Sequence, residues 1–159
     1  MKSIKVLITL LICLLIPLAI GGISGFATAA GITDWYVTLN KPSFNPPNYL
    51  FAPVWTTLYT LMGISLFIIW RSPEGRNRNN ALVIFAVQIT LNFFWSFLFF
   101  KFNLPGVALA EIVLLWTSIL MMIILFRPIS KLAAYLQVPY LLWVSFATVL
   151  NAAIWYLNL

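Results

Sequence analysis

The sequence has no histidine, a single cysteine and only three acidic residues among its 159 positions. Without histidine there is no Ser-His-Asp triad, and the commonest general base, metal ligand and axial haem ligand are missing. Cys13 alone supports neither a disulfide framework nor a zinc cluster. Asp34, Glu74 and Glu111 lie far apart in the chain, so no local two-carboxylate motif exists. These absences argue against ordinary hydrolytic or metal-dependent redox chemistry.

Charge is also scarce. Charged residues make up 8% of the chain and hydrophobic residues 63%, and the mean hydropathy is +1.02. A soluble domain carries roughly a quarter charged residues, so this composition indicates an integral membrane protein surrounded by membrane lipids. The net charge of +6 would suggest a nucleic-acid partner in a soluble protein. In a membrane protein it reflects basic loops on one side of the bilayer, and we expect no nucleic-acid partner.

Five apolar runs are each long enough to cross about 30 Å of hydrocarbon as a helix. They are predicted at about residues 4–30, 49–70, 80–100, 105–126 and 132–157, with a lid-like loop at 31–48. The runs lack the period-2 alternation of a membrane barrel, and irregular backbone cannot face lipid. The sequence therefore predicts an all-α integral membrane protein, in which residues 1–159 form a single domain built as a five-transmembrane-helix bundle.

The first run also has features of a cleavable secretory signal. Lys2 and Lys5 precede the apolar stretch, and Ala27-Thr-Ala29 resembles a cleavage site. The long glycine-containing interval before that site favours a retained helix. Gly21 and Gly25 fit the small-xxx-small pattern of close helix packing.

Basic residues are divided unevenly between the two sides of a five-helix arrangement. Seven fall on the side of the N-terminus, and only Lys41 and Lys101 fall on the other. The seven are Lys2, Lys5, Arg71, Arg76, Arg78, Arg127 and Lys131. The positive-inside rule then predicts a cytoplasmic N-terminus and an external C-terminus. The N-terminal lysines and the simple loop pattern favour a bacterial cell membrane.

Amides and large aromatic rings recur at helical spacing in three of the runs. The residues that share a face are Trp55 and Tyr59 in the second run, Gln88, Asn92, Trp95 and Phe99 in the third, and Trp143, Ala147 and Asn151 in the fifth. An amide buried in hydrocarbon without a partner costs several kcal/mol, so these faces should point into the bundle. Many rings with few polar groups are typical of a pocket for a flat, mostly apolar ligand. Alternatively, the amides only hold helices together.

Glu111 lies about two turns into the fourth run. An acidic residue within a membrane helix is a candidate functional group. The alternative is a carboxylate that reaches the nearby interface or pairs with Lys101.

Three stretches are more specific: "WYVTLNKPSFNPPNYLFAPVWTTLY" at 35–59, "LNFFWSFLFF" at 91–100 and "VPYLLWVSFATVLNAAIW" at 138–155. In order and spacing they resemble the translocator protein family. Its bacterial members are called tryptophan-rich sensory proteins and its mitochondrial members peripheral benzodiazepine receptors. The resemblance extends over nearly the whole chain.

The resemblance implies a five-helix bundle, often dimeric, with a cavity that opens toward the first loop. It implies a membrane receptor or sensor that binds porphyrins such as protoporphyrin IX, and isoquinoline- or benzodiazepine-type molecules. The porphyrin would be a ligand rather than a prosthetic group, and no cofactor is expected. The ligand-binding positions carried over by motif are Gly22, Tyr36, Pro46, Trp55, Gln88, Asn92, Trp95, Trp143, Ala147 and Asn151.

Two other activities remain open at this point. The resemblance also implies light-dependent porphyrin breakdown, for which Trp55 and Trp143 are the catalytic candidates. Transport of a tetrapyrrole or lipid is the other, although the five runs show no inverted repeat. Animal relatives carry a sterol motif in which a basic residue follows a tyrosine. No basic residue follows Tyr156 here, so this chain lacks the complete motif that would predict sterol binding.

The first loop is stiffened by proline. Pro42, Pro46 and Pro47 fix backbone angles and prevent a helix. The loop is therefore predicted to be a preorganised lid, in which Tyr36 and Pro46 close over a ligand beside Trp55. The simpler reading is a stiff connector.

Overall fold

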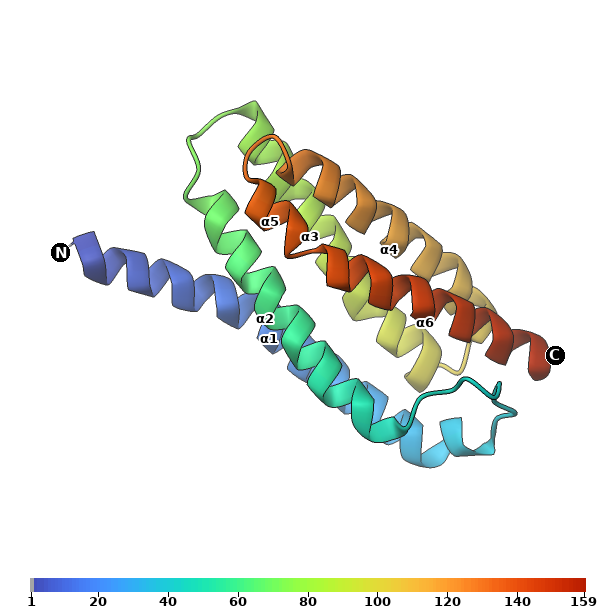
Figure 1. Ribbon diagram of the computed structural model, residues 1–159. Helices are drawn as coiled ribbons and strands as arrows, with labels where there is room; N and C mark the ends of the chain where they lie inside the picture. The colour runs from blue at the N-terminus through green and yellow to red at the C-terminus, as the bar shows by residue number, and fades with distance from the viewer. Residues whose placement is uncertain (1) are drawn as a thin grey trace.

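The computed structural model describes residues 2–159, and five of its helical segments are long and apolar enough to cross a membrane (Figure 1). The helices are α1 (Lys2–Asp34), α2 (Phe51–Trp70), α3 (Arg76–Ser96), α4 (Pro105–Phe126), the short α5 (Lys131–Tyr135) and α6 (Val138–Leu157). Two 3₁₀ turns, η1 (Tyr36–Thr38) and η2 (Asn48–Leu50), and a π-helical segment, η3 (Phe97–Lys101), complete them. No strand occurs in this part of the chain, which confirms the all-α class.

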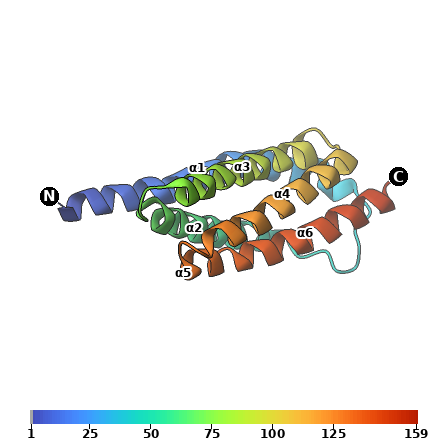
Figure 2. The same ribbon diagram turned by 90° about the horizontal axis from the view of Figure 1, so that it is seen from above.

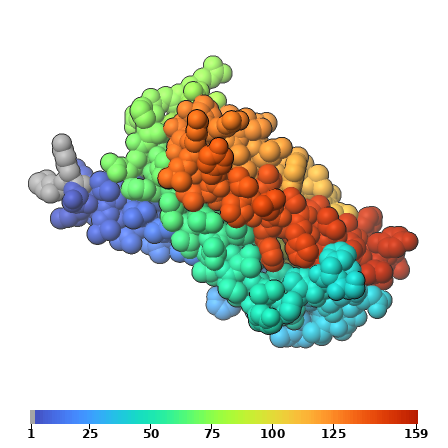
Figure 3. Space-filling model, in the orientation of Figure 1, coloured from blue at the N-terminus to red at the C-terminus, as the bar shows by residue number. Residues whose placement is uncertain are grey.

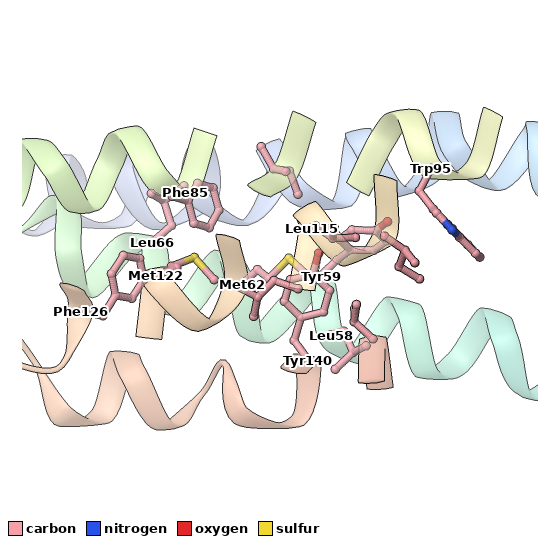
Figure 4. Packing of buried hydrophobic residues seen from close by; sticks show 14 of the residues in the cluster. Leu58, Tyr59, Met62, Leu66, Phe85, Trp95, Leu115, Met122, Phe126 and Tyr140 are labelled. Atoms are coloured by element: carbon pink, nitrogen blue, oxygen red, sulfur yellow. The ribbon is translucent and has the colours of Figure 1, made fainter. Parts of the chain in front are cut away.

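The helices form a bundle in which α1 packs along α2, α3 along α4 and α4 along α6. Figure 2 shows this arrangement from above, with the N-terminal end of α1 extending beyond the other helices. Side chains on that end, such as Leu7, Leu11 and Leu15, are exposed. In a membrane they face lipid. Inside the bundle, α2 and α4 contribute Met62, Ile119 and other apolar side chains to one continuous buried core (Figure 4).

The predicted fifth helix is interrupted. Instead of one run over 132–157, α5 ends at Tyr135 and α6 begins at Val138. Pro139 accounts for the break, because it has no N–H with which to continue the helix from α5 and is suited instead to the first turn of α6. Ser130 caps α5, since its side-chain oxygen accepts a hydrogen bond from the Ala133 N–H.

The third helix differs from its predicted span of 80–100 at both ends. It begins four residues earlier, at Arg76, and its last turn widens into η3. In this π turn the consecutive rings of Phe99 and Phe100 are both buried. The turn ends near Asn103, whose positive φ of 56° is one that asparagine tolerates.

The loop predicted at 31–48 is shorter than expected, because α1 continues to Asp34 and η1 follows at once. The remaining segment lies against the end of α6 (Figure 3). There the Asn158 amide accepts from the Asn40 N–H and donates to the Asn40 carbonyl, both at 2.9 Å. The first loop is thereby attached to the C-terminal end of the bundle.

Candidate functional site

Six of the predicted ligand-binding residues surround one volume between α2, α3, α6 and η1. They are Tyr36, Trp55, Trp95, Trp143, Ala147 and Asn151. We call this volume the tryptophan cavity. In the present conformation it is almost filled, with about 20 Å³ of free space.

Aromatic rings pack closely around the tryptophan cavity. The Trp95 ring is stacked on Phe99 with centroids 5.4 Å apart, and it meets Phe100 edge-on at 6.0 Å. Phe51 meets Trp143 edge-on at 6.2 Å. Such rings offer flat apolar faces, and a planar ligand that displaced one ring could stack on its neighbour.

Asn151 fixes the orientation of Trp95. The Trp95 Nε1–H donates to Asn151 Oδ1 at 3.2 Å, and Asn151 Nδ2 donates to the Pro105 carbonyl at 2.8 Å. One amide therefore ties α6 to α3 and to the start of α4. Because both ends of this amide have partners, Asn151 positions the cavity wall in this conformation.

Tyr36 closes the tryptophan cavity on the loop side. Its side chain is 2% exposed, its hydroxyl donates to Asn45 Oδ1, and the Lys41 Nζ lies 5.1 Å from its ring centroid. Burial raises the pKa of Tyr36 to about 12, so the hydroxyl keeps its proton at neutral pH. Asn45 also donates to the Pro46 carbonyl at 3.2 Å. Pro46 thus stabilises the loop around Tyr36 and does not line the tryptophan cavity.

The two amides predicted on α3 are buried, as expected, but they do not line the tryptophan cavity. Asn92 accepts from the Tyr59 hydroxyl at 2.6 Å and donates to the Tyr140 hydroxyl at 2.9 Å. Figure 4 shows these two rings together between the helices. Gln88, one turn earlier, is fully buried, and neither of its side-chain polar atoms has a hydrogen-bond partner. Asn92 therefore joins three helices beneath the site.

Gly22 lies on a second and larger space, between α1 and the facing surfaces of α2 and α3. We call it the α1–α2 cavity; its volume is about 330 Å³. Trp55 and Trp95 line this cavity as well as the tryptophan cavity, as do Phe51 and Phe100. The two spaces thus share an aromatic wall.

The sequence reasoning missed several residues of these walls. Phe51 and Phe146 could have been found from their spacing, four residues before Trp55 and three after Trp143. Phe100 depends on the π turn, which no spacing rule predicts. Ser24, on the α1–α2 cavity, gave no signal in the sequence.

Glu111 stays inside the bundle rather than at the interface. Both of its carboxyl oxygens are inaccessible to solvent and lack a hydrogen-bond partner, and no ion pair with Lys101 forms among residues 2–159. The alternative reading, in which Glu111 pairs with Lys101, is therefore wrong. The same part of the chain holds no group of three or more potential metal ligands from His, Cys, Asp and Glu.

Comparison with known proteins agrees with this architecture. Residues 13–157 match the TspO/MBR family. The tryptophan-rich protein TspO of Chlorobaculum tepidum is 43% identical over 97% of this chain and 98% of its own length. The tryptophan-rich sensory protein of Cereibacter sphaeroides is 35% identical over 74% and 73%, and the human translocator protein is 35% identical over 76% and 73%. The chain therefore belongs to the TspO/MBR family of integral membrane proteins, which supports a role as a membrane sensor or receptor.

Proposed function

We propose that the protein is a membrane receptor for porphyrins of the protoporphyrin type, and for isoquinoline- or benzodiazepine-type molecules, which bind in the tryptophan cavity. The observation that carries the proposal is the convergence of Trp55, Trp95 and Trp143 from three helices on one volume beneath Tyr36. A planar tetrapyrrole offers the matching surface, because stacking on indole faces needs no further directional contact.

The closed state of the cavity sets a condition on binding. About 20 Å³ of free space is room for about one water molecule, since a cavity needs roughly 10–15 Å³ to hold one. A porphyrin can bind only if rings of the wall move, and Trp55 and Trp143 are better placed to do so than Trp95. Both are half-buried, and neither indole Nε1 has a hydrogen-bond partner among residues 2–159, whereas Trp95 is held by Asn151.

Protoporphyrin IX titration of the purified protein in detergent tests this function. We expect saturable quenching of tryptophan emission, and at least a fivefold weaker affinity for Trp143→Phe and for Ala147→Leu. Trp70→Phe is the matched control, since Trp70 is exposed at the far end of α2 and lines neither cavity. Equal affinities in all four proteins would refute binding in the tryptophan cavity.

One further observation favours a light-dependent reaction as a second function. Trp55 is stacked on Tyr59 at 5.4 Å and meets Tyr140 edge-on at 6.2 Å. An illuminated porphyrin beside Trp55 could therefore accept an electron from this ring, with Tyr59 or Tyr140 as the next donor, and the reduced porphyrin could then react with dissolved oxygen. Loss of the porphyrin Soret band under light should be slower in Trp55→Phe and Trp143→Phe than in the wild type. If the Soret band of porphyrin in detergent without protein fades as fast as with the wild type, the activity is excluded.

We also propose a bacterial cell membrane as the location, with the N-terminus in the cytoplasm. The support is the excess of basic residues on the side of the α2–α3 and α4–α5 connections. Membrane lipids and the small-molecule ligand are the proposed partners, together with a second copy of the chain in a homodimer.

A further inference from the structure

The α1–α2 cavity contains an unused hydroxyl group. Ser24 is 2% exposed, it lines the cavity, and its Oγ has no hydrogen-bond partner. Three other hydroxyls of the lining have partners: Thr28 donates to the Ser24 carbonyl at 3.1 Å, Thr56 to the Ala52 carbonyl at 2.8 Å, and Tyr59 to Asn92 Oδ1 at 2.6 Å. A buried hydroxyl without a partner is costly in hydrocarbon, so Ser24 marks a place where a polar group of a ligand would be stabilised.

The mouth of this cavity lies on the lipid-facing surface. Gly22, Gly25 and Ala29 on α1, and Ala52 on α2, are exposed and belong to two membrane spans. A Cβ atom added at Gly22 or Gly25 would meet nothing within 4 Å. The small residues therefore leave an opening between two helices at the depth of the hydrocarbon.

The loop side is closed by comparison. Tyr36 is buried over the tryptophan cavity and bonded to Asn45, and the paired bonds between Asn40 and Asn158 attach the loop to α6. A ligand approaching from this side must break these contacts. A ligand approaching between α1 and α2 meets only the shared aromatic wall.

We propose that the α1–α2 cavity is a lateral antechamber, which takes an apolar molecule with one hydroxyl or carbonyl group directly from the bilayer. Ser24 hydrogen-bonds that group, and movement of the Trp55 ring then admits the molecule to the tryptophan cavity. The second step rests on the proposed function; the first does not. The volume of this cavity is about 330 Å³. This fits an alkyl alcohol or a compact aromatic amide, and not a whole tetrapyrrole.

Occupancy can be measured without any porphyrin. In proteoliposomes, 11-bromoundecanol that enters the antechamber places its bromine close to Trp55 or Trp95 and quenches their emission. We expect saturable quenching, with a midpoint three- to tenfold lower than for 1-bromoundecane, which lacks the hydroxyl; this range corresponds to one hydrogen bond. Ser24→Ala should remove the difference between the two probes. Because Ser24 Oγ bonds nothing in the structure, this variant should fold normally.

A leucine at the mouth tests the route. Gly25→Leu should abolish the saturable quenching and slow the association of a radiolabelled isoquinoline carboxamide at least fivefold. Ala19→Leu is the matched control, because Ala19 is exposed on the same helix and does not line the cavity. Quenching that is equal for both probes, or unchanged by Gly25→Leu, would overturn the antechamber. Ser24-dependent quenching without binding of porphyrin or isoquinoline would instead retain the antechamber and refute the proposed function.

Discussion

The hydrogen-bonded chain Tyr59–Asn92–Tyr140 allows a sharp test of how polar groups stabilise this bundle. Replacing Asn92 by leucine removes the group that accepts from one hydroxyl and donates to the other. Both tyrosines stay buried, at 6% and 1% exposed. Each hydroxyl left without a partner costs about 1–3 kcal/mol, but hydrogen bonds between membrane helices average about 0.6 kcal/mol and reach about 1.7. We therefore expect a loss of about 1–3 kcal/mol in the free energy of unfolding.

The matched comparison is the triple variant Tyr59→Phe, Asn92→Leu, Tyr140→Phe. It removes every member of the chain and leaves no hydroxyl unsatisfied. Replacing all partners by apolar groups of similar shape is nearly neutral, so the triple variant should be more stable than Asn92→Leu alone. Thr90→Ala, an exposed change on the same helix, should stay within about 0.5 kcal/mol of the wild type.

Unfolding by SDS in mixed micelles, followed by far-ultraviolet circular dichroism, gives these free energies. The informative quantity is the order of the variants rather than any single value. If the triple variant is the least stable of the three, the Tyr59–Asn92–Tyr140 hydrogen bonds contribute net stability beyond supplying partners for these three buried side chains. The reasoning above would then be wrong.

Four further changes follow from contacts in the structure. Gly21→Ala places a Cβ inside the Tyr59 ring and should cost about 1–3 kcal/mol in the same SDS assay, whereas Gly25→Ala should be neutral. Since the folded-state pKa of Tyr36 is raised to about 12 from an ordinary 10, its contribution to stability is complete below pH 10 and is lost as the pH approaches 12. Absorbance at 295 nm, compared with Tyr36→Phe, checks this window. Asn158→Leu should release the first loop from α6 and speed proteolysis near Asn40, whereas Asn77→Leu in the exposed α2–α3 region should not. Reporter fusions should place the C-terminus outside the cytoplasm. Moving the basic residues at 71, 76 and 78 to the 101–104 turn should place it inside instead.

Much of the fold could be predicted from the sequence because hydrocarbon imposes simple rules. A run of apolar residues must be a helix of spanning length, and its amides must face inward. Gln88 and Asn92 are buried for this reason. The break before α6 was also encoded, by Pro139, but a proline near the start of a long apolar run is compatible with either a kink or a first turn.

The site was less predictable, because spacing along one helix does not say which neighbour a side chain meets. Asn92 shares a face with Trp95, and both were expected at the ligand. Asn92 is instead held by two tyrosines from other helices, whereas Trp95 reaches the cavity. The difference is set by contacts between helices. The π turn that contains the buried rings of Phe99 and Phe100 was likewise not predicted.

The proline-rich first loop illustrates how stiffness and access are separate properties. Proline fixes the backbone and lowers the entropy lost on ordering, which suits a lid and a connector equally. The structure adds that the loop is bonded to α6 through Asn158 and that Tyr36 is buried beneath it. A loop held by the Tyr36–Asn45 bond and by the Asn40–Asn158 bonds resists opening. The small residues of α1, by contrast, already leave an opening beside Trp55. For a compact ligand dissolved in the membrane we therefore expect exchange through the α1–α2 side, whereas a tetrapyrrole, which is too large for that antechamber, must displace the loop contacts.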